Sequence, residues 1–290
     1  MKPLRHRIRE AVRRYKIPQQ VIEKDYALSY ILAGISSHSD INNTLIFKGG
    51  TALKKLYFGD YRFSEDLDFS SSNSPKGAGL ENALREAVEE SGRLMSACGP
   101  FFIEFERYLE REPHPQGQEA FTIRVQFPWH PGPLCRVKVE ITHDEPVLVK
   151  PMKLPLLHEY GENLSYDVSC YSLEEIIAEK LRTILQTHQK LIKRGWNRPR
   201  ARDYYDLWRI LDKFGDNLNA VQIATLLEKK SAHRNIPYQG ANDFFSAELI
   251  SEAHLHWDTT LGPFVAELPE CQEVLHRLRI LLKKLLPALD

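Results

Sequence analysis

The sequence lacks several features that would assign it to a particular class of protein. Its 290 residues carry no net charge, since 39 Lys and Arg balance 39 Asp and Glu, so no overall basic field indicates a nucleic-acid partner. Four cysteines are scattered without the Cys-x-x-Cys spacing of a zinc site, as is typical of reduced thiols. No apolar run reaches membrane-spanning length, and the Arg-rich N-terminus has no apolar signal segment. We therefore expect a cytoplasmic protein that makes no membrane contact.

Two aspartates, Asp66 and Asp68, are the most informative residues that are present. In an extended strand, residues two positions apart point to the same face, so these carboxylates would lie side by side. Adjacent carboxylates repel each other unless a cation lies between them, and hard oxygen ligands suit Mg²⁺. A solvated strand edge is the alternative explanation of such a pair.

A glycine pair precedes these acids. Gly49, Gly50 and Thr51 follow a predicted strand at residues 44–48 and lead into a helix-like run at residues 52–58. Flexible glycines and the free N–H groups of a helix start can hold a phosphate, although a simple turn would have the same sequence. A phosphate cradle beside a metal-binding acid pair predicts chemistry on a nucleoside triphosphate.

This strand, glycine turn, helix and acid-bearing strand resemble the opening of the nucleotidyltransferase fold in the DNA polymerase β superfamily. In more detail, the chain resembles the AbiEii/AbiGii toxin family, which includes MenT-type toxins. The resemblance runs from about Val21 to about Leu211, and no matching motif is evident in the last eighty residues. The segments that carry it are residues 47–57, 62–69, 174–181 and 202–207.

The resemblance implies a function as well as a fold. It implies a growth-inhibiting toxin of a bacterial toxin–antitoxin or phage-defence pair, with Mg²⁺ or Mn²⁺ as cofactor and a separate winged-helix antitoxin. Its substrate would be a nucleoside triphosphate, GTP or a pyrimidine nucleotide, and its acceptor would be tRNA. Two alternatives remain: a nucleotidyltransferase that acts on a small molecule or a protein, and a non-catalytic module that binds nucleoside triphosphates.

The resemblance also assigns further site residues, each with a structural alternative. Glu140 would be a third metal-binding carboxylate or the base for the attacking hydroxyl, or else half of a surface pair with Lys138. Lys55 and Lys180 would contact the triphosphate, although Lys180 could equally be a lysine whose stem covers apolar surface. Asp203 would lie in the active cleft, or cap a helix as its N-cap residue.

The remaining pattern predicts an α+β protein, with a mixed nucleotidyltransferase sheet and helices followed by an α-helical domain. We expect the first domain, with N-terminal helices, over residues 1–160 and the helical domain, completing the active cleft, over residues 161–290. Residues 146–169 are expected to form a loop because they contain Pro151 and Pro155. Residues 180–202 hold eight basic residues and no acid, with Trp196 among them, which predicts either a solvated surface or a site for phosphate charge.

Overall fold

The computed structural model describes residues 2–108 and 117–286. The chain divides into two compact units, Met1–Tyr171 and Ser172–Asp290. The first unit continues past residue 160 because strand β7 (Asp167–Cys170) pairs with strand β1 (Leu45–Lys48). Among the described residues, no helix is both long enough and apolar enough to cross a membrane.

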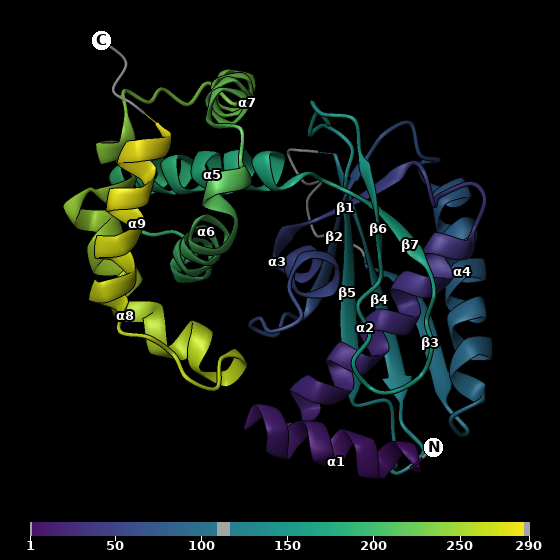
Figure 1. The fold of residues 1–290 in the computed structure, drawn as a ribbon. Coiled ribbons are helices and arrows are strands. Elements are labelled where there is room, and N and C mark those ends of the chain that lie inside the picture. Colours follow the sequence, from purple (N-terminus) through teal and green to yellow (C-terminus); the bar gives the residue numbers. More distant parts are fainter. Residues whose placement is uncertain (1, 109–116, 287–290) are drawn as a thin grey trace. The chain divides into compact units, whose positions relative to one another are not determined.

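A mixed sheet forms the centre of the first unit. The described residues contribute seven strands to it, in the order β3-β4-β5-β2-β1-β7-β6 (Figure 1). The pairs β2–β5 and β1–β7 are parallel, and the other neighbouring pairs are antiparallel. The predicted fold class is therefore confirmed for this unit. The remaining strands are β2 (Asp66–Ser71), β3 (Phe102–Tyr108), β4 (Gln118–Gln126), β5 (Cys135–Thr142) and β6 (Met152–Pro155).

The expectation of a loop over residues 146–169 is wrong, because both β6 and part of β7 fall within it. Each of these strands has only four residues, which is too short to show a clear alternation of apolar and polar side chains. Pro155 is tolerated because β6 lies at an edge of the sheet, where a missing amide removes no bond to a further strand.

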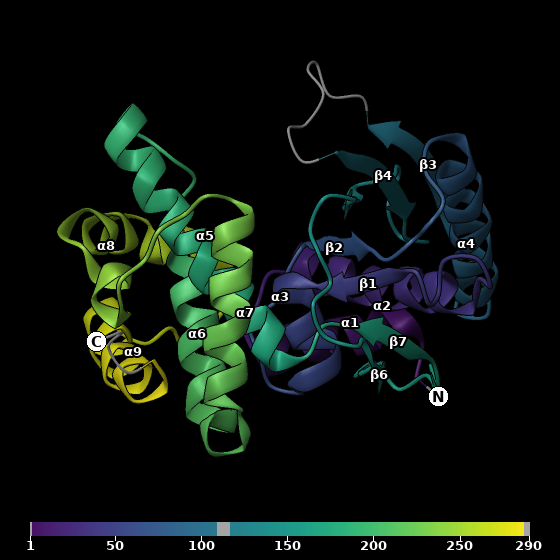
Figure 2. The same ribbon diagram turned by 90° about the horizontal axis from the view of Figure 1, so that it is seen from above.

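Two long helices, α2 (Gln19–Ser37) and α4 (Ala78–Ser96), cover one face of this sheet (Figures 1 and 2). Helix α2 is buried along most of its length, and its buried residues include the polar Glu23, Asp25 and Ser29 among apolar ones. Gly34 allows α2 to approach α4, since a Cβ atom there would lie 2.1 Å from the carbonyl oxygen of Ala87. The residues of β2 and β5 that point to this face, such as Leu67 and Val139, are fully buried.

A half-buried carboxylate, Glu162, ties the connection between β6 and β7 to α2 and to helix α1 (Leu4–Tyr15). It accepts hydrogen bonds from Tyr26 (2.8 Å) and His158 (3.0 Å), and Arg7 lies 2.6 Å away in an ion pair. Burial alone would raise the pKa of the Glu162 carboxyl, but these donors hold it well below its usual range. This connection is therefore fixed in the first unit despite its irregular backbone.

The second unit is helical in its described residues, as predicted. Helix α5 buries the expected apolar stripe, including Ile176, Leu181 and Ile184, and is capped at its start by the Ser172 hydroxyl. It ends at Gly195, whose φ of 74° is the left-handed conformation that glycine adopts readily. The long helices are α5 (Leu173–Arg194), α6 (Ala201–Phe214), α7 (Ala220–His233), α8 (Ala247–Leu261) and α9 (Cys271–Leu285).

Candidate active site

The glycine turn lies directly against the acid-bearing strand. Helix α3 (Gly49–Ala52) begins where β1 ends and continues as a π-helix at Leu53–Tyr57. Gly49 has a φ of 78°, and a Cβ atom on it would lie 2.7 Å from Oδ2 of Asp68. Glycine is thus required both by the backbone conformation and by the close approach of the backbone to a carboxylate.

The two aspartates have the predicted arrangement on β2. Asp66 and Asp68 are half-buried and alternate with Leu67 and Phe69, which pack into the core. The Thr51 hydroxyl donates a hydrogen bond of 2.5 Å to the backbone carbonyl of Asp66. This bond links the first turn of α3 to the strand, so the turn and the acids form one local unit.

Glu140 lies on the neighbouring strand, on the same face. In the parallel pairing of β2 with β5, Asp68 is opposite Glu140 and Asp66 is opposite Lys138. The Glu140 carboxylate forms an ion pair with the Lys138 amine. Glu140 therefore lies beside the acid pair, as a third site carboxylate would, and it also forms the surface pair with Lys138 that was the alternative.

Asp66 and Asp68 are arranged to hold a divalent cation, but Glu140 is not gathered with them as a third ligand. Asp66 and Asp68 present hard oxygen donors on one face of β2, which is the donor type that Mg²⁺ and Mn²⁺ prefer. Across residues 2–108 and 117–286, however, no three His, Cys, Asp or Glu side chains are gathered closely enough to hold a metal ion. Glu140 would have to turn from Lys138 to join Asp66 and Asp68.

Arg62 is a site residue to which the sequence patterns assign no role. Its side chain is buried beside the glycine turn, and a Cβ atom on Gly50 would lie 2.3 Å from its Nη2 atom. It also donates a hydrogen bond to the carbonyl of Phe63. The only sequence signal for it is its position in the 62–69 motif, because burial of an arginine cannot be read from the sequence.

Lys55 does not have the exposure expected of a phosphate-binding lysine. Its amine is buried and donates hydrogen bonds to Oδ2 of Asp25 (2.6 Å) and to the Ser29 hydroxyl (2.9 Å), both on α2. The neighbouring Lys54 is also buried and pairs with Glu159 (2.8 Å). Burial would raise the pKa of Asp25, but the Lys55 and Lys54 amines hold it below its usual range. Lys55 thus fastens the glycine-turn helix to α2.

In the second unit, Lys180 lies between two carboxylates of α6. Its amine is 2.8 Å from Oδ1 of Asp203 and 2.7 Å from Oδ2 of Asp206, and Asp206 is completely buried. Asp203 is in the first turn of α6, whose N-cap is Arg200, so the alternative that Asp203 is the N-cap residue is wrong. Lys180 thus forms ion pairs with both Asp203 and Asp206.

The basic segment of the second unit gathers several cations around the end of α5. Burial, and to a lesser extent the charges of Arg200, Arg194 and Arg182, lower the pKa of Lys190. Trp196 follows them with 70% of its surface exposed. A dense cationic cluster beside an exposed aromatic ring suits phosphate groups and stacked bases.

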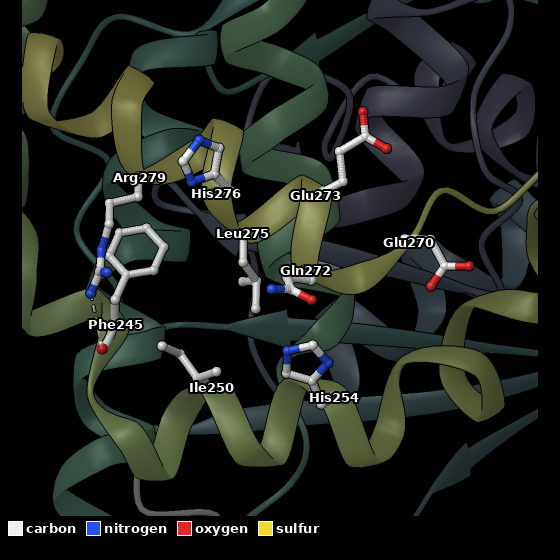
Figure 3. A pocket seen from close by; sticks show the side chains of 9 residues that line it. All are labelled: Phe245, Ile250, His254, Glu270, Gln272, Glu273, Leu275, His276 and Arg279. Atoms are coloured by element: carbon white, nitrogen blue, oxygen red, sulfur yellow. Dashed lines mark hydrogen bonds between the residues drawn. The ribbon is translucent and has the colours of Figure 1, made fainter.

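The second unit also contains a pocket of about 670 Å³, lined by residues of α8, α9 and the preceding 3₁₀ turn (Figure 3). Arg279 lies against the ring of Phe245 at one end, and Glu270 and Glu273 lie at the other (Figure 3). None of the site residues predicted from the sequence lines this pocket.

The mixed sheet, the glycine turn and the paired acids together define a protein of the nucleotidyltransferase class. Residues 30–284 match the family described as nucleotidyl transferase AbiEii toxin, type IV TA system, and the chain belongs to this family. The match continues beyond Leu211, so the family resemblance includes most of the helical unit. Membership makes the chain a transferase and a toxin-family protein, and implies a nucleoside triphosphate substrate and an antitoxin partner.

One solved structure supports the same fold. The chain is similar to MenT4, a nucleotidyltransferase toxin from Mycobacterium tuberculosis H37Rv, with a TM-score of 0.66 and 20% sequence identity. The alignment covers 98% of this chain and 90% of that one. No curated protein matches the sequence.

The buried pair between Lys55 and Asp25 yields a stability prediction. Replacing Lys55 with Met should lower the free energy of unfolding by about 3–5 kcal/mol, because it leaves the Asp25 carboxylate buried without its cation. Lys54→Met is the matched control, since its partner Glu159 is 27% exposed and can be solvated when the lysine is lost. Urea denaturation measures both variants, and an equal loss in the two would contradict the assigned role of Lys55.

A second prediction concerns Lys180. Replacing it with Met should destabilise the protein by about 3–5 kcal/mol, because the fully buried Asp206 carboxylate loses the cation that lies 2.7 Å from it. Asp203→Asn should cost less, since the Asp203 side chain is 17% exposed and Lys180 keeps its bond to Asp206. If Lys180→Met unfolds at the wild-type urea concentration, the pairing with Asp206 does not stabilise this unit.

Proposed function

We propose that this chain transfers a nucleoside monophosphate from a nucleoside triphosphate to a hydroxyl of an acceptor RNA, with tRNA as the acceptor. The hydroxyl oxygen attacks the α-phosphorus, its proton passes to a base, and the bond to the β-phosphate breaks to release pyrophosphate. The observation that carries this proposal is the close approach of the Gly49 backbone to the Asp68 carboxylate. That approach brings a backbone suited to phosphate next to acids suited to a divalent cation.

Individual residues of the first unit have distinct roles in this proposal. The backbone of Gly49 and Gly50 holds the phosphates, with the Arg62 guanidinium alongside to offset their negative charge. Asp66 and Asp68 would hold Mg²⁺ or Mn²⁺, which would supply positive charge to neutralise the triphosphate. Glu140, opposite Asp68 in the strand pairing, would supply the third carboxylate, either as a further ligand of the cation or as the base that accepts the proton of the acceptor hydroxyl.

The second unit supports RNA as the acceptor. The cationic cluster at the end of α5 and the exposed ring of Trp196 provide the two features that bind single-stranded RNA, namely charge for phosphates and a surface for stacking. Lys180 and Asp203 remain candidates for the triphosphate contact, although their mutual ion pair also stabilises the unit. The nucleotide is GTP or a pyrimidine triphosphate, and a winged-helix antitoxin counters the toxin in a phage-defence pair in the cytoplasm.

A transferase that modifies a protein or a small molecule is the second candidate. The absence of net charge favours it, because most RNA-binding proteins carry an overall basic field. A non-catalytic binding module is disfavoured, since both acids of the pair are present and share one face of β2.

The choice of acceptor can be tested by removing exposed cations. The triple variant Lys193→Ser, Arg194→Ser, Arg198→Ser should transfer labelled nucleotide to total tRNA at least tenfold more slowly, because each lost phosphate contact weakens RNA binding. Its affinity for RNA should also depend less on salt, with a log–log slope smaller by about 0.7 per lost contact. The measurement is transfer rate and RNA affinity across a salt series.

The matched control removes the same charge from α9, as Arg277→Ser, Lys283→Ser, Lys284→Ser, and should behave as wild type. Asp68→Asn should abolish transfer without unfolding the protein. Wild-type transfer by the first triple variant at every salt concentration, or label on protein instead of RNA, would exclude tRNA as the acceptor.

A further inference from the structure

The sheet face that carries the acid pair also carries a lysine in an unexpected place. Lys138 lies opposite Asp66, and Glu140 lies opposite Asp68, on adjacent parallel strands. Because neighbouring strands are about 4.8 Å apart, the side chains of all four residues project close together from one face. Three acids thus share a small area of the sheet with Lys138 and with Lys48, which lies opposite Asp68 on β1.

Contacts hold the Lys138 amine within this area. It forms an ion pair with the Glu140 carboxylate, and it lies 5.2 Å from the centroid of the Tyr108 ring. The Lys138 and Glu140 side chains are 33% and 24% exposed, so the pair is partly shielded from water. A ring face attracts a cation, and both contacts therefore favour the same position of the amine.

In this position the Lys138 amine can interact electrostatically with the neighbouring carboxylates. Asp66, Asp68 and Glu140 repel one another in the resting protein, and a nearby positive charge reduces that repulsion. The same ion pair engages the Glu140 carboxylate, and the three carboxylates are not gathered as a ligand set in the described residues. Lys138 therefore both offsets the negative charge and holds the third acid back.

We propose that Lys138 is a built-in counter-ion of the acid face, which competes with the divalent cation for Glu140. The proposal rests on the proposed function, because it concerns the cation assigned there to Asp66 and Asp68. With a divalent cation at this site, Asp66 and Asp68 would hold it and Glu140 would be free to join them, while the Lys138 amine would keep its contact with the Tyr108 ring. The long, flexible stem of Lys138 allows its amine to leave Glu140 while it stays beside the Tyr108 ring. In this role Lys138 does not contact the reacting atoms.

The competition is measured by titrating metal-free protein with Mn²⁺ in a calorimeter, without nucleotide. Lys138→Met keeps the stem and removes the charge, so it should bind Mn²⁺ roughly three- to tenfold more tightly than wild type. Lys153→Met removes the same charge from β6, at the opposite edge of the sheet, and should bind as wild type does. Lys138→Arg retains the charge and should also stay near the wild-type affinity.

A thermal melt gives a second readout that does not depend on activity. Lys138→Met should melt below wild type in metal-free buffer, since its acids have lost their counter-ion, and saturating Mn²⁺ should remove most of that difference. In a Glu140→Gln background, Lys138→Met should change the Mn²⁺ affinity little, because the competition for Glu140 is already absent.

The controls distinguish failure of this inference from failure of the proposed function. If wild type binds Mn²⁺ and Asp68→Asn does not, but Lys138→Met binds no more tightly than wild type, the counter-ion role of Lys138 is overturned and the metal site stands. If neither wild type nor Lys138→Met binds Mn²⁺, both the metal site and the counter-ion role are overturned. If Lys138→Met binds Mn²⁺ and wild type does not, Lys138 prevents metal binding in the wild-type protein, and the counter-ion role is supported.

Discussion

The contact between the Gly49 backbone and the Asp68 carboxylate is the constraint on which the rest of the first unit's site depends. A side chain at Gly49 would place its Cβ atom 2.7 Å from Oδ2 of Asp68, and the φ of 78° is itself unfavourable for other residues. Only glycine permits both this close approach to Asp68 and this backbone conformation. The turn that follows β1 therefore lies against β2, with the Gly49 backbone beside the Asp68 carboxylate.

Two further interactions keep this turn in place. The Thr51 hydroxyl bonds to the backbone of Asp66, and the Lys55 amine reaches the buried Asp25 carboxylate on α2. A short helix would be marginal alone, since few of its backbone groups have partners within it. Its attachment to β2 on one side and to α2 on the other makes it part of the core. Lysines in this helix are thus used for support, while the acids remain half-exposed.

The sequence predicted the parts of the fold that have strong local signals. The glycine turn, the alternation around Asp66 and Asp68, and the apolar stripe of α5 each follow from residue type and spacing. The strands β6 and β7 were missed because four residues are too few to show a pattern, and their pairing joins distant parts of the chain. The burial of Lys55 was missed for a related reason: its partner Asp25 lies 30 positions away in the sequence. The family resemblance supplied Lys180 and Asp203 as separate site residues but indicated neither their ion pair nor the pairing of Lys180 with Asp206.

In the function proposed for this chain, the glycine turn and the acid pair direct attack to the α-phosphorus of a nucleoside triphosphate. The most direct measurement incubates the purified chain with each nucleoside triphosphate, Mg²⁺ and total tRNA, and then determines the mass of the RNA and the phosphate products. The account predicts that modified RNA gains the mass of nucleoside monophosphate units and that one pyrophosphate is released for each unit added. Release of inorganic phosphate with unmodified RNA would show attack at the γ-phosphorus by water, and would contradict the account.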